Sequence, residues 1–125
     1  MSEVEKNIEL ADNAFEDFEK GRNAGLSIRA LYNRLYYACF YAARAALISQ
    51  GIEAKTHSGI ADRVFLVLYK EKNLISKETA ATLSRVETKR NLSDYELEID
   101  DTEEDLKEIE QKARKFVKEM NKLLD

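Results

Sequence analysis

The sequence contains no proline and only four glycines among its 125 residues. Proline breaks helices because it lacks a backbone donor, so its absence favours long helices. The chain also lacks an uninterrupted hydrophobic run of membrane length. Its longest apolar stretch, "LYYACFYAARAALI" at residues 35–48, carries Arg44 and follows Arg34, so we expect no membrane span.

Cysteine and histidine occur once each, as Cys39 and His57. Cys39 lies in an apolar run and cannot form an internal disulfide, so we expect a core thiol in a reducing cytoplasm. The charged N-terminus lacks the features of a signal peptide. A single histidine without a second histidine or a nearby cysteine does not suggest a zinc site. We therefore expect no metal and no cofactor, and a structural or surface role for His57.

Charge is distributed unevenly along the chain. The formal net charge is −4, which argues against coating nucleic acid by bulk charge. Residues 21–51 nevertheless contain four arginines and no acid, whereas residues 94–105 contain eight acids and no base. The basic segment is therefore compatible with local binding of an anion.

Apolar residues recur at helical spacing in five segments. They predict helices over about residues 2–20, 27–50, 56–71, 76–93 and 102–123, with N-caps at Ser27, Thr56, Ser76 and Thr102. The second segment is apolar on more than one face, which predicts a buried central helix. "GRNAG" at residues 21–25 predicts a stop and a turn, and "SDYELEID" at residues 93–100 an extended loop. The sequence thus predicts one all-α domain over residues 1–125, an antiparallel up-and-down bundle of about five helices.

Two features of this predicted bundle allow more than one interpretation. The tyrosines of the second segment (Tyr32, Tyr36, Tyr37 and Tyr41) can form a stacking surface for bases, or can be core residues whose hydroxyls reach water or a second subunit; we favour the core. Arg90 follows Val86 by four residues, which places it on the packed side of its helix. Its guanidinium can pair with Asp94 or bind a phosphate.

The whole chain resembles the HEPN family of nucleotide-binding helical domains. Three segments carry the resemblance: "ALYNRLYYACFYAARAAL" (residues 30–47), "GIEAKTHSG" (residues 51–59) and "RVETKRNLSDYE" (residues 85–96). The resemblance implies a helical bundle, often a homodimer, that commonly pairs with a minimal nucleotidyltransferase as a toxin–antitoxin system. Active members cleave RNA without a metal, using an Arg, usually an Asn next to it, and a His four to six residues after the Arg.

Arg90 and Asn91 match this motif, but Tyr95 stands where the His is expected. A phenol with a pKa of about 10, or a carboxylate with a pKa of about 4, is poorly suited to accept a proton near neutral pH. In some pairs the partner transfers AMP to a tyrosine near the motif, so the resemblance makes Tyr95 the candidate acceptor.

We therefore expect a dimeric HEPN protein that binds nucleotide or RNA and pairs with a nucleotidyltransferase. Arg90 and Asn91 would hold phosphate, Arg85 would support them, and the ribonuclease motif would be degenerate. One alternative is an active metal-independent endoribonuclease that uses Tyr95 or Asp94. The other is a pure interaction module that docks the transferase.

Overall fold

The computed structural model describes residues 1–95 and 100–124; the side chains of residues 93–95 lie outside the description. This part of the chain contains helices and no strand. The elements are α1 (Glu3–Asn23), α2 (Ile28–Ser49), α3 (His57–Arg63), the π-helical η1 (Val64–Glu71), α4 (Lys77–Tyr95) and α5 (Glu103–Asn121). The prediction of an all-α bundle of about five helices is confirmed.

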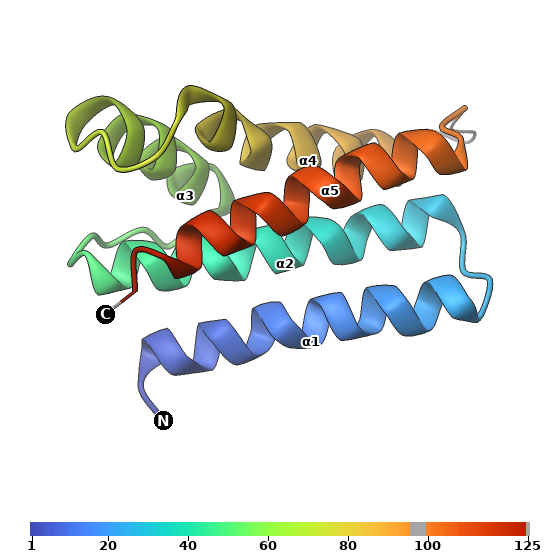
Figure 1. Cartoon of the computed structure of the whole chain (residues 1–125), viewed down its shortest axis with the longest axis horizontal. Helices are drawn as coiled ribbons and strands as arrows, with labels where there is room; N and C mark the ends of the chain where they lie inside the picture. Colours follow the sequence, from blue (N-terminus) through green and yellow to red (C-terminus); the bar gives the residue numbers. More distant parts are fainter. Residues whose placement is uncertain (96–99, 125) are drawn as a thin grey trace.

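Helix α2 occupies the centre of the bundle, as its apolar pattern predicts. It packs against α1, α3, α4 and α5, and Figure 1 shows α1 and α5 running along it on different sides. Leu35, Tyr36 and Cys39 are fully buried along it. Residues on α2 are therefore held in place by packing against four other helices.

The predicted N-caps hold the helix starts in place. The hydroxyls of Ser27 and Thr56 accept hydrogen bonds from the amides three residues on, over 3.1 and 2.9 Å. Ser76 does the same for Thr79. Thr102, the fourth predicted N-cap, forms a reciprocal capping box with Asp105 at α5. These bonds satisfy amides that have no partner inside the helix.

The first helix ends a few residues later than predicted, but within residues 21–25, where we expected a stop and a turn. Helix α1 continues to Asn23, and the turn comes at Gly25, whose φ of +79° favours glycine. Gly21 is buried inside the helix, and a Cβ there would come within 2.6 Å of Leu26 Cδ1. Glycine at this position thus permits close packing and does not end the helix.

Two further segments differ from the prediction. The third predicted helix is divided: its second half, η1, has wider π-helical turns and ends with the Lys72 amide bonded to the Val67 carbonyl at 2.8 Å. Residues 93–95, expected in an extended loop, are the last turn of α4. The rest of that predicted loop, residues 96–99, lies outside the described residues.

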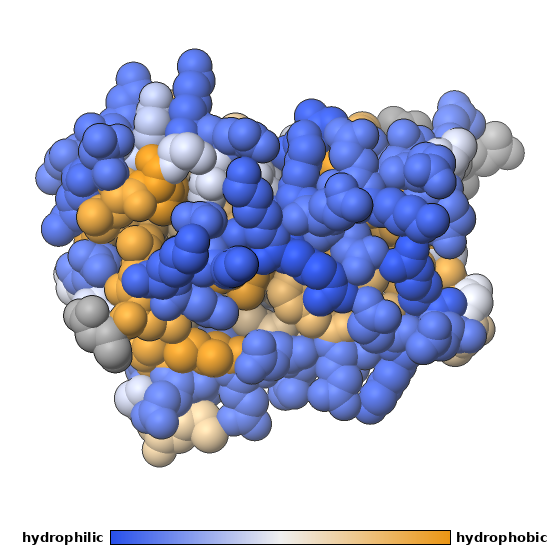
Figure 2. Space-filling view, in the orientation of Figure 1, coloured by the Kyte–Doolittle hydropathy of each residue, from blue (hydrophilic) through white to orange (hydrophobic). Residues whose placement is uncertain are grey.

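Hydrophilic residues cover most of the face shown in Figure 2, and a hydrophobic area lies toward the end that carries α3 and the C-terminus. Across the described ranges, no helix has the length and apolar character needed to cross a bilayer. The same ranges hold no group of three or more His, Cys, Asp or Glu side chains placed to bind a metal.

Candidate phosphate-binding site

Arg90 lies on α4 with its side chain half-buried against α2. Its guanidinium carbon is 4.9 Å from the centre of the Tyr36 ring and 5.5 Å from that of Tyr37. Both separations are within the range of cation–π attraction. The prediction that Arg90 faces the packed side of its helix is confirmed. The sequence also allowed an ion pair between Arg90 and Asp94, but the side chain of Asp94 is outside the description.

A second arginine meets the same aromatic ring. The Arg34 guanidinium carbon is 5.3 Å from the centre of the Tyr37 ring. Arg34 also bonds to the neighbouring Asn33 side chain and forms a long 3.7 Å contact with Asp17. Because the Asp17 side chain is 58% exposed, this ion pair is weak and screened by solvent. Tyr37 therefore holds two guanidinium groups, one from α2 and one from α4.

His57 joins this group from the start of α3. Its ring stacks on Phe40 with 4.2 Å between ring centres and meets the Tyr37 ring edge-on at 6.0 Å. Its Nδ1 is 2.5 Å from the Tyr36 hydroxyl. The residue as a whole remains exposed. Arg34, Tyr36, Tyr37, His57 and Arg90 together are called the aromatic–cation cluster below.

The electrostatics of the cluster centre on Tyr36. Burial, helped by the negative charge of Glu87, raises the pKa of the Tyr36 hydroxyl well above its usual value, although Arg90 opposes the shift. Tyr36 is therefore a neutral phenol at all ordinary pH values. Glu87 lies one turn before Arg90 on α4, and its buried Oε2 accepts no hydrogen bond from the residues that the structure describes.

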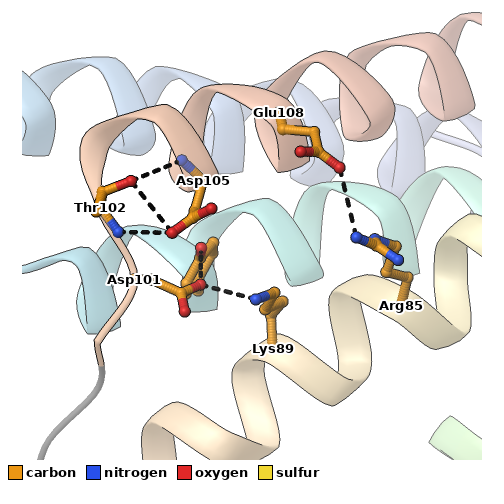
Figure 3. A network of polar contacts seen from close by, with 7 residues as sticks. Arg85, Lys89, Asp101, Thr102, Asp105 and Glu108 are labelled. Carbon is orange, nitrogen blue, oxygen red and sulfur yellow. Dashed lines mark hydrogen bonds and ion pairs between the residues drawn. The ribbon is translucent and has the colours of Figure 1, made fainter.

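The other residues singled out by the sequence are placed differently. Arg85 turns toward α5, where its Nη2 lies 3.4 Å from a carboxylate oxygen of Glu108 (Figure 3). Asn91 is exposed beside Arg90. Tyr95 is the final residue of α4, and its side chain is outside the description. Among the described contacts, Arg85 therefore touches none of the rings of the cluster.

A separate polar network joins the end of α4 to the start of α5. Lys89 donates to Asp101 over 2.8 Å (Figure 3). The buried Tyr32 also donates to this carboxylate. Burial acts to raise the pKa of Asp101, but the hydrogen bonds from Lys89 and Tyr32 prevail and lower it. The network thus ties Lys89 of α4 and Tyr32 of α2 to the residue that precedes the Thr102 cap of α5.

Sequence reasoning found Arg90 but missed its neighbours. We expected a structural or surface role for His57 because no partner is adjacent in sequence. The structure supplies that partner from α2, 21 residues away. Arg34 and Glu87 were not candidates either. A signal for Arg34 was present, since Arg34 and Tyr37 are three residues apart and share a helix face; no comparable local signal links His57 to Arg90.

Three known proteins are similar to this chain over most of its length. A "UPF0332 protein" of Archaeoglobus fulgidus is 34% identical over 96 residues, 76% of this chain and 74% of the relative. A "UPF0332 protein" of Thermotoga maritima is 29% identical over 78% of this chain and 74% of its own length. A Methanocaldococcus jannaschii protein named "Putative toxin MJ0142" is 28% identical over 98% of this chain and 82% of its own length.

The family comparison covers almost the whole molecule and gives the identity of the fold. The HEPN domain model matches residues 4–123, a range that covers the described helices except the first residue of α1 and includes all five residues of the aromatic–cation cluster. The chain therefore belongs to the HEPN domain family.

Proposed function

We propose that this protein is a HEPN toxin-like protein that binds RNA or nucleotide through phosphate at the aromatic–cation cluster. One observation carries the proposal: the guanidinium groups of Arg34 and Arg90 both lie over the ring of Tyr37. Two helices thus concentrate permanent positive charge on one half-buried aromatic residue of an otherwise acidic chain.

The chemistry of these groups suits a phosphodiester. A guanidinium donates two parallel hydrogen bonds to phosphate oxygens and stays charged at every ordinary pH. Stacking on an aromatic ring limits its motion, so less conformational entropy is lost when the phosphate binds. The partly exposed Tyr37 and His57 rings add faces or edges on which a base can stack.

The toxin-like role takes its support from the Methanocaldococcus jannaschii relative, whose name describes a toxin. For this chain the proposal further includes a minimal nucleotidyltransferase as the antitoxin partner. In this proposal α4 has Tyr95 where active relatives have a His, and Tyr95 is the residue to which the partner transfers AMP.

Binding is tested with a fluorescein-labelled RNA pool and with labelled ADP, by anisotropy at several salt concentrations. Arg90→Ala should weaken binding of whichever ligand the wild type takes by at least about tenfold, and should reduce the salt slope by about one phosphate contact. Arg85→Ala, measured beside it, tests whether Arg85 supports the site. Arg63→Ala is the matched control, because it removes an exposed arginine of α3 and should change affinity less than twofold.

Binding that is equal in Arg90→Ala and Arg63→Ala would refute the phosphate site. Absence of binding in the wild type, together with co-purification of a coexpressed transferase, would instead support the pure interaction module. Intact mass of the coexpressed chain tests the modification: one added adenylyl group is expected on the wild type and none on Tyr95→Phe.

A further inference from the structure

We propose that the open face of α2 extends the aromatic–cation cluster into a longer site for single-stranded RNA, in which Tyr41 and Arg44 form the second half. The inference rests on the proposed function, because it lengthens the site at which Arg34 and Arg90 would bind phosphate. Arg44 belongs to no motif of the sequence, and Tyr41 was expected in the core.

The open face of α2 is a single stripe along the helix. Between residues 34 and 48, all of which the structure describes, every residue is buried except five: Arg34, Tyr37, Tyr41, Arg44 and Ile48. These five, called the α2 stripe below, follow one another at intervals of three and four residues and therefore share one face of the helix. Within this span, the stripe is the side on which α2 can meet a ligand.

The rings of the α2 stripe continue those of the aromatic–cation cluster. The centre of the Tyr41 ring lies 5.9 Å from that of Tyr37, and the Tyr37 ring in turn meets His57 at 6.0 Å. Phe40, only 7% exposed, packs against Tyr41 with 5.3 Å between ring centres and an interplanar angle of 72°. Three partly exposed or exposed rings, those of His57, Tyr37 and Tyr41, thus offer neighbouring surfaces on which bases can stack.

Arg44 carries a positive charge that the described part of the chain does not neutralise. It is partly buried, yet among the described residues it makes no ion pair, hydrogen bond or ring contact. Taken alone, Arg44 would be a long side chain whose guanidinium reaches water. Its place on the stripe gives it more meaning: Arg44 follows Tyr41 by three residues, as Arg34 precedes Tyr37 by three. The stripe therefore places one arginine at each end of a pair of tyrosine rings.

The spacing of the two arginines favours a chain of nucleotides over a single nucleotide. Ten residues separate Arg34 from Arg44, which is about 15 Å along the helix axis. A mononucleotide carries its phosphates at one end and can meet only one of the two cations, whereas phosphates recur along an RNA strand. Stacking on the tyrosine rings further requires unpaired bases, because the bases of a duplex are already stacked on one another.

A second copy of this chain is the other occupant to consider, because tyrosine and arginine are also common at protein interfaces. In a symmetric dimer built on the α2 stripe, the stripe would meet itself. The two copies of Arg44 would then approach each other without a described acid to pair with, and like charges oppose association. Single-stranded RNA brings the opposite charge together with flat bases, so the charge and the rings of the stripe favour RNA.

The test compares ligands of different length and strandedness on the full-length protein by fluorescence anisotropy. The ligands are labelled ADP, a labelled single-stranded RNA of about eight nucleotides, and the same RNA annealed to its complement. Wild type should bind the single strand at least about tenfold more tightly than ADP or the duplex. Arg44→Ala should weaken binding of the single strand about tenfold and reduce its salt slope by about one phosphate contact, while the affinity for ADP stays within about twofold.

Variants of Tyr41 separate base stacking from a structural role. Tyr41→Leu removes the ring and should weaken binding of the single strand about fivefold or more, whereas Tyr41→Phe keeps the ring and should bind as wild type does. Arg63→Ala, the control used above, should leave all three affinities unchanged.

Three outcomes would overturn the extended site. One is equal affinity of the wild type for ADP and the single strand. Another is binding of the single strand that neither Arg44→Ala nor Tyr41→Leu weakens. The third is a fall in mass from two chains to one in Arg44→Ala, measured by light scattering, which would assign the stripe to a second copy. A wild type that binds none of the three ligands would instead refute the proposed function itself.

Discussion

Phe40 belongs to the core and also packs against two rings of the aromatic–cation cluster. It is 7% exposed, contacts Tyr36 and Tyr41, and supports the His57 ring. We predict that Phe40→Ala lowers the free energy of unfolding by about 3–5 kcal/mol, because a buried aromatic is replaced by a cavity. Urea denaturation followed by circular dichroism measures the change.

Leu66→Ala is the matched control for Phe40→Ala. Leu66 is also a large apolar side chain on a helix, but it is 55% exposed. Its truncation should change stability by less than about 1 kcal/mol. If the two variants unfold at the same urea concentration, Phe40 does not hold the central helix as described.

Asp101 gives stability a dependence on pH. Its pKa is lowered in the folded state, since the hydrogen bonds from Lys89 and Tyr32 outweigh the effect of burial. The charged Asp101 therefore stabilises the fold at pH values above its pKa in the unfolded chain, which is about 3.9. This stabilisation is lost as the pH falls through the lower pKa of the folded state. Asp101→Asn should therefore cost about 1–2 kcal/mol near pH 7, and the difference from wild type should shrink below about pH 4.

Urea denaturation of both proteins between neutral and acidic pH measures this difference. Asp105→Asn is a useful comparison: it alters an exposed capping carboxylate but leaves the pair of Lys89 and Asp101 intact. A cost of Asp101→Asn that stays constant down to pH 3 would show that the charge of Asp101 is not what stabilises the end of α4.

At the scale of the element, the first turn of α3 couples a cap to a glycine. The Thr56 hydroxyl accepts from the Gly59 amide at 2.9 Å, and a Cβ on Gly59 would lie 2.7 Å from the same oxygen. Thr56→Ala should cost about 1 kcal/mol through loss of the cap. Gly59→Ala should stabilise the helix by about 1 kcal/mol, but only in the Thr56→Ala background, where the Thr56 hydroxyl oxygen is absent.

A double-mutant cycle measures this coupling. Gly59→Ala is expected to bring little or no gain in the wild type but a clear gain in the Thr56→Ala background. Equal effects in both backgrounds would mean that the Thr56 side chain moves aside freely, and that glycine is not needed at the turn that positions His57.

For the whole molecule, we predict a homodimer whose interface includes α4 and brings two copies of Arg90 to one cleft. Leu92, two residues after Arg90, is 48% exposed, and burying such a side chain at an interface would be favourable. Light scattering at micromolar concentration should give the mass of two chains. Leu92→Glu should shift the protein toward monomer because a charge cannot be buried there unpaired.

Leu10→Glu is the control for the dimer. Leu10 is 37% exposed on α1, so a charge there should leave the mass of two chains unchanged. A wild-type monomer at that concentration would refute the assembly. So would a dimer in which the two Arg90 side chains lie on opposite outer faces.

The number of helices, four of their starts and the central position of α2 followed from the sequence alone. These features are local: capping bonds span three residues, and the apolar faces of α2 repeat within each turn. The half-buried side of Arg90 followed in the same way from its spacing to Val86. Such contacts are set by helix geometry, so they can be predicted without knowing how the helices pack.

Only the tertiary structure decided which residues surround Arg90. His57 lies 33 positions before it, and the two side chains meet the same rings because α3 and α4 both pack on α2. The role of Gly21 was also decided by packing, because Leu26 packs back against the helix at this residue. Helical periodicity specifies which face of a helix is buried, but not which other helix lies against that face; that choice depends on how all the buried faces fit together at once.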